Sequence, residues 1–422
     1  MAERPGQSLP KQARLWSDLK AAYRFLSNSR IDAQAVGGPH RAWTRRQCAL
    51  HPVILCVQDG SDLQAVKVAA DQYVQQSTLA VTPQGQILGM LDQRWYRRVE
   101  TPAGETRAQR QARWRESDIW LEAVTAIGRS VPTPHLIHVA DRAADDLRFM
   151  HTCLEQDAGF VVRARHDRTL QGTAAHLWAH LAGSPVAGSR TIQIGQQRDR
   201  KGKITRQGRT AHVTVRYATV RLERSSHDRH GEPLTVQAVY LQELGPPAGV
   251  EAVDWMVLTS EPVACFDDAC RILAYYQCRW VIEEWHRCLK EGCALEDSQV
   301  DTPEDLQRLA AVLSIVAVRM MTLRDLADVQ RYGGQAQDPK ALQDQVPWVW
   351  ILVVARLWET EPATLTPRQF WLNIARQGGW IGRKGDGRPG WKVIWRGWYD
   401  ISQMVRGAEL AQQGLSREQK CG

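Results

Sequence analysis

The chain has 422 residues, enough for about two to four domains and a full hydrophobic core. Lysine and arginine together number 54 against 46 aspartate and glutamate residues, and the resulting net charge of +8 favours a polyanionic partner. The nine cysteines form no Cys-x-x-Cys pair, which argues against a zinc site and is typical of reduced thiols in a cytosolic protein.

The sequence contains no obvious export or membrane signal. Its first residues lack the apolar run of a signal peptide. The longest apolar stretch, residues 309–318, is too short to cross a bilayer. We therefore predict a cytoplasmic protein without a membrane partner.

The first 45 residues predict a small helical segment. Residues 17–26 contain no Gly or Pro and begin with Ser17 and Asp18, which favour a helix N-terminus. Two interpretations of the cations in this segment stay open, a solvated basic face or a contact with DNA. These cations are Lys11, Arg14, Lys20 and Arg24.

Two apolar runs, residues 53–57 and 136–140, are each followed closely by an aspartate, Asp59 and Asp141. Their composition predicts buried strands. Acids at the ends of buried strands lie where α/β proteins expose their ligands. We therefore assign residues 46–169 to the first part of an α/β core.

Residues 160–166 predict a further strand, on which Arg163 and Arg165 share one face by the two-residue period. Two cations on one face suit contacts with a phosphate backbone. The alternative is that they blunt an exposed edge of the sheet.

Residues 170–254 show alternating apolar and polar positions separated by polar turns, and they predict an antiparallel β insertion. The loop at 198–209 carries six cations and one acid. Charge runs are usually solvated surface, but such a loop also suits a clamp on phosphates, because each phosphate contact releases counterions.

Residues 275–290 predict a continuous helix that Gly292 ends. At about 100° per residue, four polar side chains of this helix fall within a stripe roughly 60° wide. They are Tyr276, Arg279, Glu283 and Lys290. Amphipathic helices normally turn Leu or Val toward the interior. A narrow stripe with one acid, two cations and a phenol instead indicates an anionic partner and a metal.

The remainder of the chain predicts helices. Thr302 and Pro303 favour the start of a long helix, and we assign residues 255–332 to the second part of the core. Residues 333–422 form a separate helical unit. Within it, residues 385–390 match Gly-x-Gly-x-x-Gly, but Pro389 and the missing strand before this run indicate a basic surface loop.

Three blocks, in the same order, resemble the DDE transposases of the insertion-sequence-four group, to which the transposon-five enzyme belongs. The most specific is residues 279–286, Arg-Trp-Val-Ile-Glu-Glu-Trp-His, within a signature helix of Tyr-Arg-Glu-Lys spacing. The others are residues 141–145, Asp-Arg-Ala-Ala-Asp, and residues 21–26, Ala-Ala-Tyr-Arg-Phe-Leu. The resemblance runs from about Lys20 to Gly397.

This resemblance implies a ribonuclease-H-like α/β core, interrupted by the β insertion and flanked by N-terminal and C-terminal helical segments. It identifies Asp59, Asp141 and Glu283 as the catalytic residues and as ligands of two Mg²⁺ ions, with Mn²⁺ as a possible substitute. Three carboxylates suit such ions, because hard cations prefer oxygen ligands and two of them assist phosphodiester transfer.

The resemblance also implies the contacts with double-stranded DNA. Tyr276, Arg279 and Lys290 hold phosphates beside the scissile bond, and the basic residues at 163 and 165 contact the backbone near the cleaved end. Trp255 lies 21 residues before Tyr276, the offset of a tryptophan that stacks on a flipped base. The alternative for Trp255 is an ordinary core tryptophan.

Cut-and-paste transposition is the activity that the resemblance implies. Members of the family cut the transposon ends, form and reopen a hairpin, and join the 3′ ends to target DNA. The expected setting is the nucleoid of a bacterial cell, and the expected assembly is a homodimer formed through the C-terminal helices.

Two departures from the family pattern leave an alternative open. Ala143 replaces the usual Glu, and the family carries a further helical segment before the helix at residues 21–26. A transposase-derived DNA-binding protein, truncated and catalytically inactive, is therefore the competing interpretation, although retention of all three carboxylates argues against it. A structure-selective nuclease would lack the signature helix. A glycosidase site would not explain the cations on that helix.

Overall fold

We describe the fold from a computed structural model of the chain. The structure describes residues 8–13, 15–63, 73–98, 102, 104–106, 109, 113–129, 134–173, 175–198, 204–223, 232–328, 336–383, 386 and 388–418. Residues 199–203 of the basic loop at 198–209, and two glycines of the run at 385–390, lie outside the described residues.

A nine-stranded mixed sheet forms the centre of the molecule, with the order β3-β2-β1-β4-β5-β11-β10-β9-β6. The pairs β1–β4 and β4–β5 are parallel, and the other pairs in this sheet are antiparallel. The strands are β1 (Val53–Leu63), β2 (Tyr73–Val81), β3 (Ile87–Arg97), β4 (His135–Ala140), β5 (Gly159–Arg163), β6 (Gly188–Ile194), β9 (Arg209–Leu222), β10 (Leu234–Glu243) and β11 (Asp254–Thr259). The predicted α/β class is confirmed.

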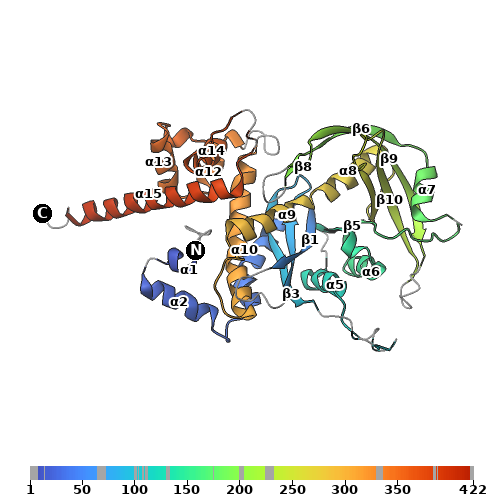
Figure 1. Ribbon diagram of the computed structural model, residues 1–422, viewed down its shortest axis with the longest axis horizontal. Helices are drawn as coiled ribbons and strands as arrows, with labels where there is room; N and C mark the ends of the chain where they lie inside the picture. Colours follow the sequence, from blue (N-terminus) through green and yellow to red (C-terminus); the bar gives the residue numbers. More distant parts are fainter. Residues whose placement is uncertain are drawn as a thin grey trace.

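The strands between residues 170 and 254 continue the core sheet. β11 pairs with β5 on one side and with β10 on the other, so that β9, β10 and β6 extend the sheet beyond the parallel strands. A two-stranded ribbon, β7 (Gln197–Arg198) with β8 (Ile204–Arg206), and the short helix α7 (Leu177–Gly183) accompany them. One hydrogen-bonded layer therefore runs from β3 to β6 (Figure 1).

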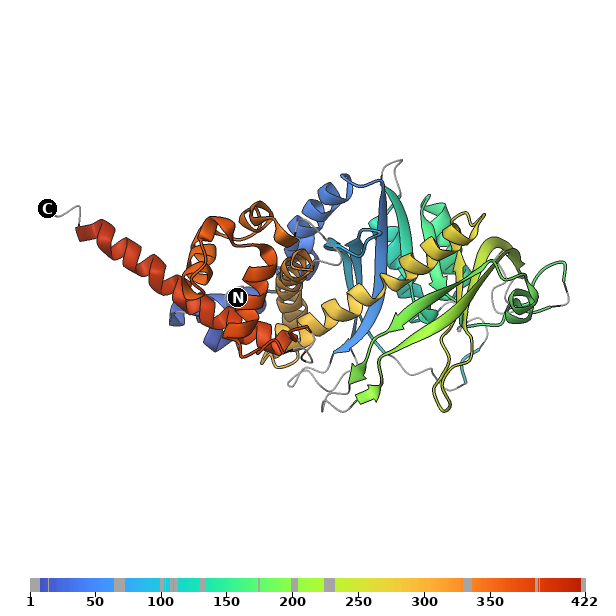
Figure 2. The ribbon, with the colours of Figure 1, turned by 90° about the horizontal axis from the view of Figure 1, so that it is seen from above.

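Helices cover both faces of the sheet. On one face, α8 (Phe266–Gln277) and α9 (Trp280–Arg287) pack on apolar side chains such as Val57, Val139 and Val161. On the other face, α5 (Asp118–Ile127) and α6 (Leu147–Glu155) pack on the side chains that point the opposite way, such as Phe160 and Val162. Figure 2 shows α8 and α9 running across the strands. The two-residue alternation of each strand thus supplies two separate cores.

A long buried helix, α10 (Pro303–Leu326), lies beside the sheet between the N-terminal and C-terminal helices (Figure 1). Thr302 caps it by accepting a hydrogen bond from the Asp305 amide, as the sequence predicts. By length and composition α10 could cross a membrane, so the expectation that no stretch is long enough was wrong. However, 61% of its most apolar window is buried inside the fold, which is typical of a core helix.

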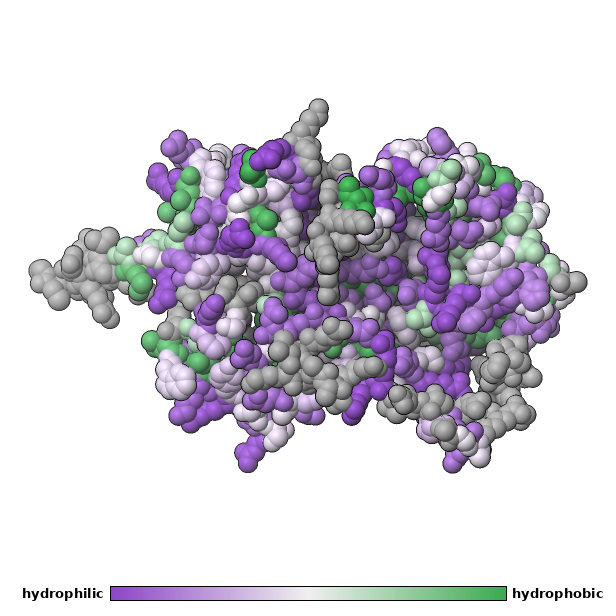
Figure 3. Space-filling view, viewed as in Figure 1, coloured by the Kyte–Doolittle hydropathy of each residue, from purple (hydrophilic) through white to green (hydrophobic). Residues whose placement is uncertain are grey.

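The N-terminal helices are α1 (Leu9–Gln12), α2 (Trp16–Leu26) and α3 (Ala33–Cys48), and the helix predicted at 17–26 is confirmed as α2. The C-terminal helices are α12 (Pro339–Gln343), α13 (Trp348–Leu357), α14 (Pro367–Gln377) and α15 (Trp391–Glu418). Neither α3 nor α15 was expected from the sequence. α15 projects away from the rest of the molecule, and the face shown in Figure 3 is mostly hydrophilic with scattered apolar residues.

Candidate active site

Asp59 lies within strand β1, two residues beyond the last residue that pairs with the parallel strand β4. The sequence predicts that the strand ends before Asp59, and this was wrong, because β1 continues to Leu63 through antiparallel pairing with β2. The parallel pairing with β4, however, stops at the pair Val57 and Val139. Asp59 therefore occupies the point where the two parallel strands separate, which is where α/β sheets open a crevice.

Asp141 occupies the corresponding position on the neighbouring strand. It follows the last residue of β4 and lies two residues beyond Val139, just as Asp59 lies two residues beyond Val57. Its Oδ1 accepts a hydrogen bond of 2.8 Å from the Ala143 amide, which starts the short 3₁₀ helix η1 (Arg142–Ala144). The two aspartates thus share one level and one face of the sheet, the face covered by α8 and α9.

The segment predicted as one continuous helix is divided into three parts. α8 ends at Gln277, α9 begins at Trp280, and a π-helical turn, η2 (Cys288–Gly292), follows α9. Gly292 ends the segment as predicted, but not through a left-handed conformation, since its φ is not positive. A side chain at Gly292 would instead collide with the indole ring of Trp395 in α15.

Arg279, at the turn between α8 and α9, connects two of the acids. Its Nη1 lies 3.6 Å from Oδ2 of Asp59, and its Nη2 lies 2.5 Å from Oε1 of Glu283. The Arg279 side chain is only 11% exposed, and its guanidinium also lies 5.1 Å from the centre of the Trp280 ring. One buried cation is therefore shared by a strand carboxylate and a helix carboxylate.

The pKa of Asp59 reflects the other two acids. It is raised from 3.8 to about 7, chiefly by burial and also by the negative charges of Asp141 and Glu283, against the lowering effect of Arg279. Carboxylates from β4 and α9 therefore act on the carboxylate of β1. A group of like charges with a shifted pKa in a crevice is typical of a functional site.

The carboxylates suit a divalent metal, although they do not enclose one. Within the described residues, no three Asp, Glu, His or Cys side chains gather as a metal-binding group. Arg279 gives the physical reason, because it pairs with both Asp59 and Glu283 and supplies the positive charge there. The donor set still fits Mg²⁺ or Mn²⁺, since hard cations bind carboxylate oxygens and the raised pKa of Asp59 reflects a need for positive charge.

Tyr276 and Lys290 lie on either side of α9. Tyr276 is buried, packs edge-on against Trp255 with ring centres 5.4 Å apart and an angle of 76°, and lies close enough to Arg279 to act on its pKa. Lys290 lies in the π-helical turn, where its Nζ donates to the Asp62 carbonyl of β1 and lies 3.4 Å from Oε1 of Glu296. Their contact with phosphates stays a prediction.

Arg163 and Arg165 occupy different environments. β5 ends at Arg163, so the predicted strand to residue 166 was wrong, and Arg165 lies exposed beyond it. Arg163 is half-buried and donates to the Asp254 carbonyl at 2.8 Å. Because β5 lies between β4 and β11 in the middle of the sheet, the alternative that these cations blunt a sheet edge was also wrong.

Trp255 stands on β11 on the same face of the sheet as the acids. It is half-buried and packs at the margin of the core beneath α8 and α9, next to Tyr276. Its role in stacking on a base stays a prediction, since Trp255 also packs against the core.

Sequence reasoning gave no role to Asp145, although it lies in the block at 141–145. Its Oδ2 accepts hydrogen bonds from the amides of Arg165 (2.7 Å) and His166 (3.0 Å), and its Oδ1 pairs with Arg168 at 2.5 Å. Asp145 thereby shapes the loop that carries Arg165. The available signal was the block itself, in which a second aspartate follows Asp141 by four residues.

Three stretches of the chain match models of known protein families. Residues 1–31 match a transposase DNA-binding segment, residues 111–319 match a transposase DDE domain, and residues 368–417 match the transposase Tn5 dimerisation domain. Asp141 and Glu283 lie inside the DDE match, and Asp59 precedes it.

Proposed function

The chain belongs to the DDE transposases of the Tn5 type, with a ribonuclease-H-like core, and from this premise we propose that it moves DNA by a cut-and-paste reaction. It cleaves transposon ends through a hairpin intermediate and joins the 3′ ends to target DNA. Asp59, Asp141 and Glu283 are the catalytic residues and the metal ligands in this proposal.

The observation that supports the proposal is the effect of two distant carboxylates on a third. Asp59 comes from β1, Asp141 from the end of β4 and Glu283 from α9, and the charges of both of the latter raise the pKa of Asp59. A structural salt bridge needs only one acid and one base. Three acids with one buried arginine, which pairs with Asp59 and Glu283, favour a site made for additional positive charge.

Asp59, Asp141 and Glu283 would hold divalent ions, which would supply activation of the attacking oxygen and neutralisation of charge on the attacking and leaving oxygens. The chain's own residues then hold the DNA. Arg279 is free to transfer its guanidinium from Asp59 and Glu283 to a phosphate, since arginine binds phosphate and carboxylate with the same planar fork. Lys290 and Tyr276 supply a second cation and a phenol for neighbouring phosphates.

A tight hairpin forces a base out of the stack, which costs a few kcal/mol. Trp255 is half-buried beside Tyr276, so a part of its ring remains available to a base. We assign Trp255 the role of stacking on the flipped base and thereby offsetting that cost. Arg163 and Arg165 contact the backbone near the cleaved end.

The matched DNA-binding and dimerisation segments support DNA and a second copy of the chain as partners. We propose that residues 1–45 recognise transposon ends, that residues 46–169 and 255–332 form the catalytic core around the β insertion at 170–254, and that residues 333–422 form the dimer contact. Transposition in the cytoplasm of a bacterium, at the nucleoid, is part of the same proposal.

The decisive experiment is Mg²⁺-dependent nicking of a plasmid that carries the gene with its flanking DNA. We expect Asp59→Asn and Glu283→Gln each to reduce nicking on the order of a thousandfold or more, because each removes a ligand that acts in the transition state. Asp157→Asn is the matched control, since Asp157 is exposed and Asn tolerates its positive φ of 53°. Equal nicking by the wild type and both site variants would refute the assignment, and a wild type without nicking would favour an inactive DNA-binding protein.

A further inference from the structure

We propose that Arg308 of α10 is a positioning residue that locks the DNA-binding segment to the catalytic core and so determines which phosphodiester bond is cut. The inference rests on the proposed transposase function. It concerns a residue outside the acidic site, and it follows from a junction between two parts of the chain about 280 residues apart.

Arg308 is a buried arginine whose partners are mainly backbone carbonyls. Its Nε donates to the Ile31 carbonyl at 2.6 Å, and its Nη1 donates to the Leu26 carbonyl at 2.8 Å. The same Nη1 lies 3.1 Å from Oδ1 of Asp305, one turn earlier on α10. Only 7% of Arg308 is exposed, so these bonds are shielded from water.

The two carbonyls mark the corner between α2 and α3. Leu26 is the last residue of α2, where helix carbonyls lack an internal partner. Ile31 directly precedes Asp32, which caps α3 by accepting from the Gln34 amide at 3.1 Å. Arg308 therefore binds both ends of the short connection, and the matched DNA-binding segment, residues 1–31, ends at this corner.

The same helix is bonded to the catalytic core a short distance farther along. The carbonyl of Ser314 accepts from Nε1 of Trp285 in α9 at 3.4 Å, and its hydroxyl accepts from Nε2 of Gln93 in β3 at 2.8 Å. Six residues separate Ser314 from Arg308, which corresponds to about 9 Å of helix. α10 thus connects the α2–α3 corner to the helix that carries Glu283.

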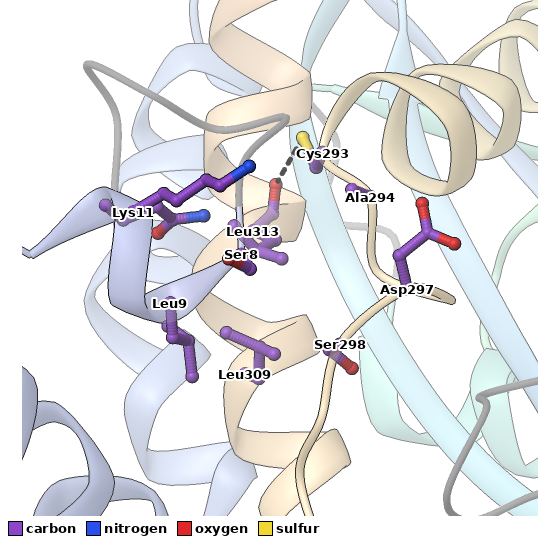
Figure 4. A pocket seen from close by; sticks show the side chains of 10 residues that line it. Ser8, Leu9, Lys11, Cys293, Ala294, Asp297, Ser298, Leu309 and Leu313 are labelled. Atoms are coloured by element: carbon purple, nitrogen blue, oxygen red, sulfur yellow. Dashed lines mark hydrogen bonds between the residues drawn. The ribbon is translucent and has the colours of Figure 1, made fainter.

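The packing of α1 beside α10 is incomplete, unlike that of α2 and α3, which contact α10 directly. A cavity of about 220 Å³ separates α1 from α10 and from the loop that follows the π-helical turn. Figure 4 shows Leu9 of α1 facing Leu309 of α10 across the cavity. Cys293 and Ser298, which follow the π-helical turn, also line it. Because a cavity leaves its lining without full contact, α1 is held less firmly than the corner at Arg308.

These contacts predict a specific defect when Arg308 is lost. The residues of the segment that touch DNA would remain, but the segment could pivot on α10. A misplacement of about 1 Å in the reacting atoms costs on the order of 100-fold in rate. Binding of the ends would then persist while cleavage became slow and imprecise.

The experiment compares Arg308→Ala and Arg308→Lys with the wild type. Lysine keeps the charge but lacks the planar fork that reaches two carbonyls. Arg129→Ala is the matched control, because Arg129 is 69% exposed and pairs with Asp157 at the surface. End binding is measured by gel shift on the DNA that flanks the gene, and nick positions are mapped by sequencing the cleaved ends in Mg²⁺.

We expect both Arg308 variants to bind end DNA within about twofold of the wild type and to make correctly placed nicks about 100-fold more slowly, with new nicks at neighbouring bonds. Arg129→Ala should match the wild type. The inference is overturned if nick positions stay unchanged in both variants, or if binding falls in parallel with cleavage. If Arg308→Ala does not fold, Arg308→Lys decides by the same two readouts.

Hydrogen exchange separates this inference from the proposed function. In Arg308→Lys without DNA, amides of α2 and of the α2–α3 corner should exchange faster, while those of α9 keep the wild-type rate. Unchanged exchange at the corner would overturn the inference even if the wild type is an active transposase. If the wild type shows no nicking, the proposed function fails, and faster exchange at the corner would still support the anchor.

Discussion

Two buried arginines, Arg279 and Arg308, hold the molecule together at different places and with different partners. Arg279 is bound to the carboxylates of Asp59 and Glu283, whereas Arg308 is bound chiefly to the backbone carbonyls of Leu26 and Ile31. Both side chains are about one-tenth exposed or less. Because the two side chains are similarly buried, the difference between the two arginines lies in the groups that accept their hydrogen bonds.

A carboxylate side chain can rotate, gain a proton or bind a metal, so each partner of Arg279 has an alternative. A backbone carbonyl in a fixed corner has none, and it remains an unsatisfied buried acceptor when its donor is removed. Arg279 is therefore suited to exchange its partners during a reaction, and Arg308 to keep them. Three predictions test this contrast.

The largest expected effect is on stability. Arg308→Gln should lower the free energy of unfolding by roughly 3 to 5 kcal/mol, because it strands two carbonyls and leaves Asp305 without its cation. Arg279→Gln should cost about 1 kcal/mol, since Asp59 can take up a proton and Glu283 is partly exposed. Urea unfolding of both variants in EDTA gives the comparison, and equal losses would remove the contrast.

The next effect concerns pH. The folded pKa of Asp59 is about 7 and its ordinary value is 3.8, so the wild type loses stability as the pH rises from about 4 to about 7. Asp59→Asn has no such charge. In EDTA at pH 8 it should be more stable than the wild type by roughly 2 to 4 kcal/mol, and below pH 4 this advantage should vanish. An advantage that is constant across this range would contradict the assigned cause.

The smallest expected effect concerns the ring pair of Trp255 and Tyr276. It tests whether this pair, like the partners of Arg279, can exchange its contact for one with DNA. Trp255→Ala should leave the first nick nearly unchanged and slow hairpin formation about tenfold, because stacking on a base is worth roughly 1 to 3 kcal/mol. Timed reactions resolved on denaturing gels separate the two steps. A uniform loss of nicking and hairpin formation would mean that the ring only supports Tyr276.

The sequence was sufficient for the strands and acids, because local composition determines them. Buried apolar runs identified β1 and β4, and Asp141 directly follows β4 as expected, whereas Asp59 lies inside β1. It was not sufficient for the length of β1. Its polar residues after Val57 stay in a strand only because β2 pairs with them up to Leu63 and Tyr73, a contact that local propensity does not encode.

Other differences have similar causes. α3 contains Gly37, Gly38 and Pro39, which disfavour a helix interior, yet the helix is capped by Asp32 and packs on α10. The segment at 275–290, predicted as one continuous helix, is divided at Arg279 and ends in a π turn, which local composition does not encode. Arg308 gave no signal, because its two distant partners are backbone carbonyls, which leave no motif in the sequence.

The continuity of the nine-stranded sheet limits how the protein can be shortened. Because β11 pairs with β5 on one side and β10 on the other, deleting the β insertion would not leave a tidy smaller enzyme. It would leave β11 with a row of unpaired amides and carbonyls, the kind of edge through which proteins aggregate. A shortened version of this protein must therefore keep the strands between residues 170 and 254.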